Sequence, residues 1–454
     1  MKNIFIALSF LFIISSCRQF KPPVPQFVFS GKITNLNDSI IKLVHPLDEI
    51  VFKINEDGTF SDTISDFVDG FYKLKAGKEY TDIYIEDGFN LYFDLDIVDF
   101  DESIKYKGLG ADENNYLAQK LLFTENVDFW GFYKLSEDSF IHKIDSFKAV
   151  AHEFLGRFID ASPHMSKTFI NHQKADLKYF APSSKENYQK YHRFLSKNDE
   201  FTVSDKFYDY RKKVELENIF LKEVDNYTSY AESFFENQIA EDDTLERAFS
   251  MLRIINREIK DNKLKKFFIY RSAKSEMKNT KKLDEYWALV SFMVTEKRDF
   301  KELKKIKRKL DKIKVGSVSP LTNFKDENDK EYSLKDFRGK IVYIDCWAQW
   351  CAPCKKEIPF LSKLEEKYAD KDITFIKLSL DADVDAWKTY IKEKNLEENA
   401  FILENNFKSE FAKSYMINGI PRFILLDKNL KIIDSNAKRP SDEELVLQFD
   451  KLLD

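Results

Sequence analysis

The chain has 454 residues, which is too many for one ordinary hydrophobic core, so we expect two or three domains. The formal net charge is -5, and the charged residues, 33% of the chain, are divided almost evenly between the two signs. Such a balance supplies no overall field for nucleic acid and excludes it as a predicted partner. Aromatic residues make up 15% of the chain, which is typical of packed cores rather than low-complexity sequence.

The N-terminus has the features of an export signal. One basic residue, Lys2, is followed by an apolar stretch from Ile4 to Ile14, which is too short to cross a bilayer as a helix. Ser15-Ser16-Cys17 comes next and resembles the lipobox of bacterial lipoprotein signal peptides. The resemblance implies that residues 1–17 are a signal peptide with its lipidated cysteine, cleaved before Cys17, which then carries the lipid anchor. An ordinary secreted protein with an incidental cysteine is the alternative.

The lipoprotein interpretation places the mature protein in the cell envelope of a Gram-negative-type bacterium, facing the periplasm. Arg18 is not an acidic sorting residue, which favours the outer membrane by analogy. Residues 18–26 are rich in proline and are expected to be an extended tether. The mature chain has too few cysteines for a disulfide scaffold, so its close pair, Cys351 and Cys354, is expected to be a working site.

Residues 27–108 are predicted to form an antiparallel β domain. Their apolar and β-branched residues occur in short runs, separated by turn signals such as Asp57-Gly58 and Asp87-Gly88. We expect strands at Phe27-Val28-Phe29, Ile40–Val44, Ile50–Phe52, Thr81–Ile85 and Leu91–Phe93.

Residues 109–314 change to a helical periodicity and are expected to form an all-α region. Five of the six histidines lie here, but none has the spacing to a second ligand type that indicates a metal site. The Lys- and Arg-rich stretch 300–314 keeps apolar residues at helical spacing, which favours a solvated helix face over contact with an anionic surface. The clearest core-facing stripe consists of Phe140, Ile144, Phe147, Ala151, Phe154 and Phe158.

Residues 315–454 alternate between strand and helix patterns, which predicts an α/β domain with helices on both faces of a sheet. The run from Ile341 to Ile344 is apolar without alternation, which is typical of a central strand buried on both sides. Ser441 with Glu444 forms a capping-box pattern for a terminal helix. We expect strands at 340–346, 373–380, 422–426 and 431–434, and helices at 351–368 and 384–394.

The most informative segment is Trp350-Cys351-Ala352-Pro353-Cys354, at the junction between the predicted central strand and the following helix. Two cysteines separated by two residues can close a small disulfide ring. The first sulfur would meet the positive end of the helix dipole, which favours the thiolate, and the thiolate is the nucleophile of disulfide exchange. We therefore predict a redox dithiol in which Cys351, at a water-accessible helix tip, is the more exposed sulfur.

The stretch from Asp345 to Cys354 resembles the active-site segment of thioredoxins, and Gly419-Ile420-Pro421 resembles their cis-proline loop. The lead-in Val315–Pro320 and the stretch Phe337–Lys340 are similar to the envelope thioredoxins of the TlpA and ResA type. The resemblance covers residues 315–454, under a third of the chain, and implies a thioredoxin-like fold for them. Residues 27–108 loosely resemble the β-rich module that often precedes such domains in envelope lipoproteins, which identifies no chemistry.

The resemblance implies a membrane-anchored thiol-disulfide oxidoreductase that uses no metal or cofactor. Cys351 would attack a disulfide of a protein substrate, Cys354 would resolve the mixed disulfide, and a membrane dithiol would return the electrons, so that the protein acts as a reductase. A disulfide oxidase or isomerase uses the same atoms and is the nearest alternative. A peroxidase is disfavoured because no Thr-x-x-Cys pattern surrounds Cys351. An envelope binding lipoprotein with a non-catalytic thioredoxin-like domain is the alternative from another class.

Further site residues follow from their positions in these motifs. Asp345 is a candidate proton carrier between the two cysteines, because burial in an apolar strand would raise its pKa; an inert, hydrogen-bonded Asp is the alternative. Lys377 matches a strand lysine that neighbours this acid in thioredoxins. Trp350 is expected to flank the dithiol, and Pro421, if cis, to present the preceding backbone to an extended substrate. Arg422 stands where the family more often has a small polar residue, and either tunes substrate choice or points outward.

Cys346 stands where the family commonly has Phe. We expect it to be a small buried residue, because strand cysteines usually behave as hydrophobic side chains. A third redox thiol, or a zinc site formed with Cys351 and Cys354, is the alternative, although a second ligand pair at the usual spacing is missing. Trp347, on the strand side of the motif, is expected to lie in the core.

Overall fold

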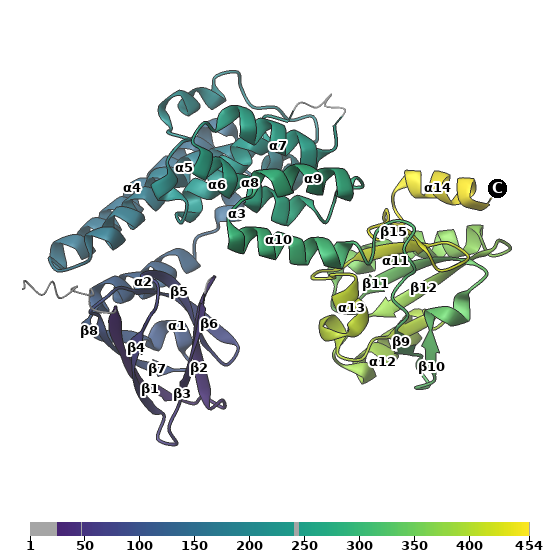
Figure 1. The fold of residues 1–454 in the computed structure, drawn as a ribbon, viewed down its shortest axis with the longest axis horizontal. Helices are drawn as coiled ribbons and strands as arrows, with labels where there is room; N and C mark the ends of the chain where they lie inside the picture. The colour runs from purple at the N-terminus through teal and green to yellow at the C-terminus, as the bar shows by residue number, and fades with distance from the viewer. Residues whose placement is uncertain (1–24, 47, 240–244, 454) are drawn as a thin grey trace, which may run out of the picture. The chain divides into compact units, whose positions relative to one another are not determined.

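The computed structural model describes residues 25–46, 48–239 and 245–453. The predicted signal peptide, Cys17 and most of the tether lie outside the described residues. The contacts divide the chain into two compact units, Met1–Glu215 with Phe220–Ser233 and Leu216–Ile219 with Phe234–Asp454, so the helical region is shared between them. The protein is multidomain, with a β-rich, a helical and an α/β part in chain order (Figure 1). Within the described ranges, no helix is long and apolar enough to span a bilayer.

Two four-stranded sheets enclose one core at the start of the first unit (Figure 1). Alternate residues of each strand turn inward, and Phe29 packs on Phe52 of one sheet and on Phe60 and Phe93 of its own. The sheet orders are β4-β1-β7-β8 and β3-β2-β5-β6; the pairing of β1 with β7 is parallel and every other pairing is antiparallel. The strands are β1 (Gln26–Thr34), β2 (Ile40–His45), β3 (Asp48–Lys53), β4 (Thr59–Ser65), β5 (Gly70–Ala76), β6 (Glu79–Ile85), β7 (Asn90–Asp96) and β8 (Lys105–Leu109).

Two adjacent asparagines at the start of α2 (Ala111–Glu125) cover the edges of both sheets. Asn114 accepts a hydrogen bond from the backbone N–H of Tyr84 in β6 (2.7 Å) and donates to the carbonyl of the same residue (2.9 Å). Asn115 makes the same pair of bonds with Tyr106 in β8, at 2.9 and 3.0 Å. Since β6 and β8 are edge strands, their free backbone groups would otherwise need water or another strand.

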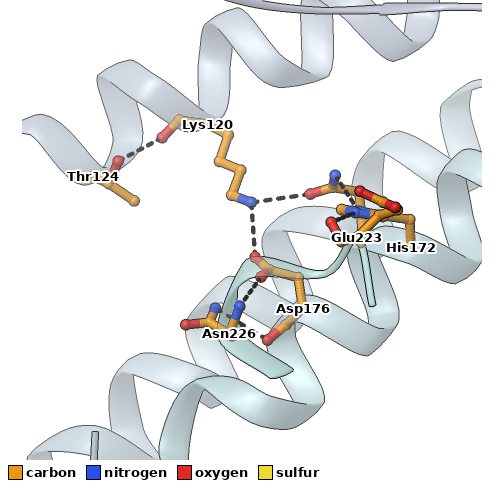
Figure 2. A network of polar contacts seen from close by, with 7 residues as sticks. Lys120, Thr124, His172, Asp176, Glu223 and Asn226 are labelled. Carbon is orange, nitrogen blue, oxygen red and sulfur yellow. Dashed lines mark hydrogen bonds and ion pairs between the residues drawn. The ribbon is translucent and has the colours of Figure 1, made fainter. Parts of the chain in front are cut away.

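The helices of the first unit are tied together by polar side chains (Figure 2). Lys120 of α2 forms an ion pair with Asp176 of α5 (Lys167–Ser196), with the nitrogen 3.3 Å from the oxygen. Asp176 also accepts from the backbone N–H of Asn226 in α6 (Asp225–Glu236), at 3.2 Å. His172 lies 3.1 Å from the carbonyl oxygen of Glu223. This network fixes α2, α5 and α6 relative to one another.

The predicted apolar stripe lies on α4 (Glu137–Ala161) and faces the core, as expected: Phe140 and Ile144 are buried, and Phe147 and Phe154 pack against buried residues. In α10 (Lys297–Leu310), the apolar residues Leu303 and Leu310 are buried against the protein, and the basic residues between them are mostly exposed. The other α-helices described in this region are α3 (Phe129–Phe132), α7 (Arg247–Glu258), α8 (Asn262–Glu276) and α9 (Leu283–Met293), and the short α1 (Phe100–Ser103) lies between β7 and β8.

The C-terminal part contains one seven-stranded sheet, with the order β10-β9-β13-β12-β11-β14-β15. Every residue of the central strand β11 is buried, as its apolar sequence predicts. Leu361 of α11 and Phe449 of α14 pack with Tyr343 in one cluster, so these two helices cover the same face. The elements are β9 (Asn323–Lys325), β10 (Glu331–Ser333), β11 (Ile341–Trp347), α11 (Ala352–Lys367), β12 (Ile373–Ser379), α12 (Val384–Lys394), β13 (Ala400–Ile402), α13 (Glu410–Ser414), β14 (Arg422–Leu426), β15 (Ile432–Asp434) and α14 (Glu443–Leu453).

The predicted capping box of the last helix is wrong. The hydroxyl of Ser441 donates instead to Glu357 of α11, at 3.1 Å. The cap is supplied by Asp442, whose carboxylate accepts from the backbone N–H of Glu444 at 3.0 Å. A buried acceptor on a neighbouring helix therefore outcompetes the local cap, which the sequence pattern alone does not reveal.

Candidate functional site

Cys351 and Cys354 are joined by a disulfide bond at the junction of β11 and α11, with their Cα atoms 5.3 Å apart. Cys351 is the N-cap residue of α11, and its Sγ accepts a hydrogen bond from the backbone N–H of Cys354 at 3.2 Å. The sulfur thus takes the place of the Ser or Asp oxygen of an ordinary cap, because the first N–H groups of a helix have no acceptor within it. The same bond and the positive helix end would stabilise a thiolate after reduction.

The expectation that Cys351 lies at a water-accessible helix tip is wrong in degree. Cys351 is the more exposed of the pair, but only 3% of its surface is accessible, against 1% for Cys354. The reason is packing: the two cysteines share a hydrophobic cluster with Trp347, Trp387 and Ile420, among others. In this disulfide-bonded form, little of Cys351 is therefore exposed to an approaching thiolate.

Asp345 lies on β11 and is 2% exposed. Its pKa is raised to about 8, mainly by burial and also by the carboxylates of Glu357 and Glu365, although the charge of Lys377 acts in the opposite direction. Within the described part of the chain, Oδ1 of Asp345 has no hydrogen-bond partner. A carboxyl group in this setting can hold or release a proton near neutral pH, as the proton-carrier hypothesis requires.

Lys377 is the cross-strand partner of Asp345 on β12, as the motif comparison suggested. Its ammonium, however, forms an ion pair with Glu365 of α11, with the nitrogen 2.6 Å from the oxygen. Lys377 thus acts on Asp345 through its charge, without a bond to it.

A second buried carboxylate, Glu357 on α11, was missed by the sequence analysis. Glu357 accepts hydrogen bonds from the backbone N–H and the hydroxyl of Ser441, at 3.0 and 3.1 Å, and Arg439 lies 3.9 Å away. It therefore ties the helix of the dithiol to the segment before α14. The sequence feature that could have indicated this role is the position of Glu357 three residues after Cys354, on the helix face that turns inward.

Asp381 is another residue that the sequence analysis gave no role. It follows β12 and is buried, which raises its pKa, and it accepts from the hydroxyl of Ser379 (2.7 Å) and the backbone N–H of Gln349 (3.0 Å). It thereby fixes the loop that leads from β11 to Cys351. An Asp directly after an apolar strand was the signal for this role.

The remaining predicted residues lie around the dithiol. Trp350 is 54% exposed, and its ring lies 6.4 Å from that of Phe407. Trp347 is in the core, as expected. The Ile420–Pro421 peptide bond is cis, and the side chain of Ile420 packs against the cluster that contains both cysteines.

Cys346 is a free, fully buried thiol, and burial raises its pKa strongly. Because side chains alternate along β11, it lies on the opposite sheet face from Asp345. Its cross-strand partner Arg422 does not point outward: it is half-buried, and its Nε donates to the carbonyl of Ser435 at 2.9 Å. In the described ranges, no group of three or more His, Cys, Asp or Glu side chains is placed to hold a metal ion.

Comparison with known proteins identifies the C-terminal domain. A thioredoxin-like family model matches residues 339–432. The thiol-disulfide oxidoreductase ResA of Bacillus thuringiensis subsp. konkukian is 32% identical over 137 residues, which are 30% of this chain and 78% of that protein.

Solved structures from Bacteroides are also similar to this domain. The thioredoxin domain of a thiol-disulfide oxidoreductase from Bacteroides vulgatus is 32% identical and covers 31% of this chain and 98% of that one, with a TM-score of 0.29. A thiol-disulfide oxidoreductase from Bacteroides fragilis is 28% identical and covers 30% of this chain and all of that one, with a TM-score of 0.28. Because the C-terminal domain is 32% identical to ResA and covers 78% of it, the chain belongs, through this domain, to the ResA-type thiol-disulfide oxidoreductases of thioredoxin-like fold.

Proposed function

We propose that this thiol-disulfide oxidoreductase is a lipid-anchored reductase of protein disulfides in the cell envelope. The observation that carries the exchange chemistry of this proposal is the hydrogen bond from the N–H of Cys354 to the sulfur of Cys351 at the positive end of α11, and the reductase direction is inferred from the resemblance to the envelope thioredoxins of the TlpA and ResA type. A sulfur held in this way is a stabilised thiolate in the reduced protein, and a stabilised thiolate is both a nucleophile and a good leaving group.

The exchange proceeds in two steps. The Cys351 thiolate attacks one sulfur of the substrate disulfide, which forms a Cys351–substrate bond and releases the other substrate sulfur as a thiolate. Cys354 then loses its proton and attacks Cys351, so that the second substrate sulfur leaves. The substrate gains two electrons and two protons, and the protein ends with the Cys351–Cys354 disulfide. A membrane dithiol returns the two electrons to this protein.

Asp345 supports the second step as a proton carrier. With a pKa of about 8 in the oxidised protein, it is neutral or ionised depending on small changes in pH or in neighbouring charge. The ionised form accepts the proton of Cys354 when that thiol attacks, and gives it up when the disulfide is reduced again. Ile420, next to Pro421, contributes backbone beside the dithiol for an extended substrate segment.

The anchoring part of the proposal rests on the sequence of residues 1–26. The lipobox-like Ser15-Ser16-Cys17 and the proline-rich tether support a lipid on Cys17 that holds the protein at the membrane, with Arg18 favouring the outer membrane. Metabolic labelling with a radioactive fatty acid tests it: label on the protein that is lost in Cys17→Ser supports the anchor, and an unlabelled protein contradicts it.

Trapping of a mixed disulfide tests the exchange chemistry. The reduced Cys354→Ser variant, incubated with disulfide-bonded insulin, should accumulate an adduct through Cys351 that dithiothreitol cleaves. The Cys351→Ser variant should form none. Reduced wild-type protein that leaves insulin intact, or an equal yield of adduct from Cys351→Ser, would contradict the proposed function.

A further inference from the structure

A cleft of about 1070 Å³ in the second unit adjoins the active-site edge of the sheet. Its walls are the end of α10, the segment around β9, and residues 403–414, which follow β13 and include α13. Strands β11, β12 and β13 are parallel, so the residues that follow β13 and those that follow β11 lie at the same sheet edge. The segment after β11 carries Cys351, so the cleft and the dithiol lie at the same edge of the sheet.

Aromatic contact links the cleft to the dithiol more closely. Trp350, the residue before Cys351, has its ring 6.4 Å from that of Phe407, and Phe407 directly precedes the cleft residue Lys408. Since Trp350 is more than half exposed, a chain bound at the sulfur can contact it.

The lining of the cleft carries more basic than acidic residues, five lysines against Glu331, Glu404 and Glu410. Lys325 is neutralised by Glu404, with the nitrogen 2.6 Å from the oxygen. In the described part of the chain, the other four lysines of the lining have no carboxylate within ion-pair distance, and only Glu331 and Glu410 remain to offset them. The four are Lys309, Lys312, Lys408 and Lys413.

The basic character continues along α10. Lys305, Arg308 and Lys309 are spaced three and four residues apart and are exposed, so they share one helix face, and the exposed Lys312 lies just after the end of the helix. The whole chain has a net charge of -5, so this concentration of positive charge is opposite in sign to the average. The apolar side of α10 is buried in the protein and has nothing to insert into a bilayer.

We propose that this cleft binds an acidic segment of the protein substrate and so selects disulfides that have Asp or Glu residues nearby in the chain. The inference rests on the proposed function and names its substrate class. Charge complementarity supports the occupant, because unpaired lysines attract carboxylates and speed encounter. Leu321 in the same lining is exposed and can pack against a side chain, which favours a polypeptide over a small anion.

Two synthetic peptides test the proposal with the full chain. Both contain the same internal disulfide, and one has a run of Asp residues beside it where the other has Lys. At low ionic strength the reduced protein should reduce the acidic peptide about tenfold faster, and the preference should shrink in high salt. Lys408→Glu with Lys413→Glu should abolish the preference, whereas Lys392→Glu with Lys394→Glu, which makes the same charge change on exposed residues of α12, should keep it.

The outcomes separate the two proposals. If neither peptide is reduced, the proposed function fails. If both are reduced at equal rates in low salt, or if Lys408→Glu with Lys413→Glu keeps the preference, the acidic-segment inference alone is overturned. A third outcome is that the protein binds phosphatidylglycerol vesicles, that Lys408→Glu with Lys413→Glu removes this binding, and that both peptides are reduced at equal rates. This outcome would assign the cleft to a lipid surface and also overturn the inference.

Discussion

Asp345 and Lys377 are direct partners across β11 and β12, yet the ammonium of Lys377 binds Glu365 and leaves Oδ1 of Asp345 without a hydrogen bond in the described part of the chain. Burial raises the pKa of this acid to about 8, and the charges of Lys377, Glu357 and Glu365 shift the pKa without a hydrogen bond to its Oδ1. This arrangement makes its pKa adjustable by residues on α11 and β12.

Replacing Asp345 with Asn should slow resolution of the mixed disulfide by about 100-fold, a typical contribution of a positioned acid or base. The decay of a Cys351-bound substrate, followed in stopped flow from pH 6 to pH 10, checks it. The wild-type rate should rise through the pKa of about 8, and the variant should lose that step. A profile identical to wild type removes Asp345 from the mechanism.

Asp345 should also make the oxidised protein less stable as pH rises. Its pKa is about 8 in the folded state and about 3.9 in unfolded chains, so the folded state holds more protons between these values and loses stability as pH increases through that range. The free energy of unfolding of Asp345→Asn, relative to wild type, should therefore grow by about 2 to 4 kcal/mol between pH 5 and pH 9. Denaturant unfolding at both pH values measures it; a difference that stays constant contradicts the buried ionisation.

Neighbouring charges should move the pKa of Asp345 in opposite directions. Glu357→Gln removes a negative charge that raises this pKa, so the midpoint should fall; Lys377→Met removes the positive charge that lowers it, so the midpoint should rise. The carboxyl signal of Asp345 in NMR titrations of the oxidised variants reports both shifts. Shifts of the same sign would show that packing changes, rather than charge, dominate.

Asn114→Ala should destabilise the first unit by about 3 kcal/mol, because it leaves the N–H and C=O of Tyr84 unpaired at the edge of β6. Asn198→Ala, at an exposed position of the same unit, should change stability by less than about 0.5 kcal/mol. Thermal unfolding measures both. Since the dithiol lies in the other unit, its exchange rate should stay at the wild-type value in both variants.

Local patterns predict much of the fold where one strong signal dominates. The strand 422–426 and the helix 384–394 coincide with β14 and α12, and the buried run at Ile341–Ile344 is the central strand. Strands β4, β5 and β8 were missed: β4 buries few residues, and β5 and β8 alternate lysines with apolar residues in short stretches that read as loops. β4 pairs with β1, and β5 pairs with β2 as well as with the adjacent β6, so part of the pairing comes from strands that a local pattern does not contain.

In the candidate site, too, residues of a local motif were predicted and residues with distant partners were missed. Cys351, Cys354 and Asp345 were found because the motif is continuous in sequence. Glu357 and Asp381 were missed because their roles depend on partners far along the chain, Ser441 in one case and Gln349 in the other. The low exposure of Cys351 depends on Trp387 and Ile420, which are also distant in sequence.

Titration of the purified protein in glutathione redox buffers tests the central claim most directly. The account predicts one reversible two-electron transition, monitored by alkylation of free thiols, that is lost in Cys351→Ser and kept in Cys346→Ser, because Cys346 is buried on the other face of the sheet. The absence of a transition in the wild-type protein, or its survival in Cys351→Ser, would contradict the account.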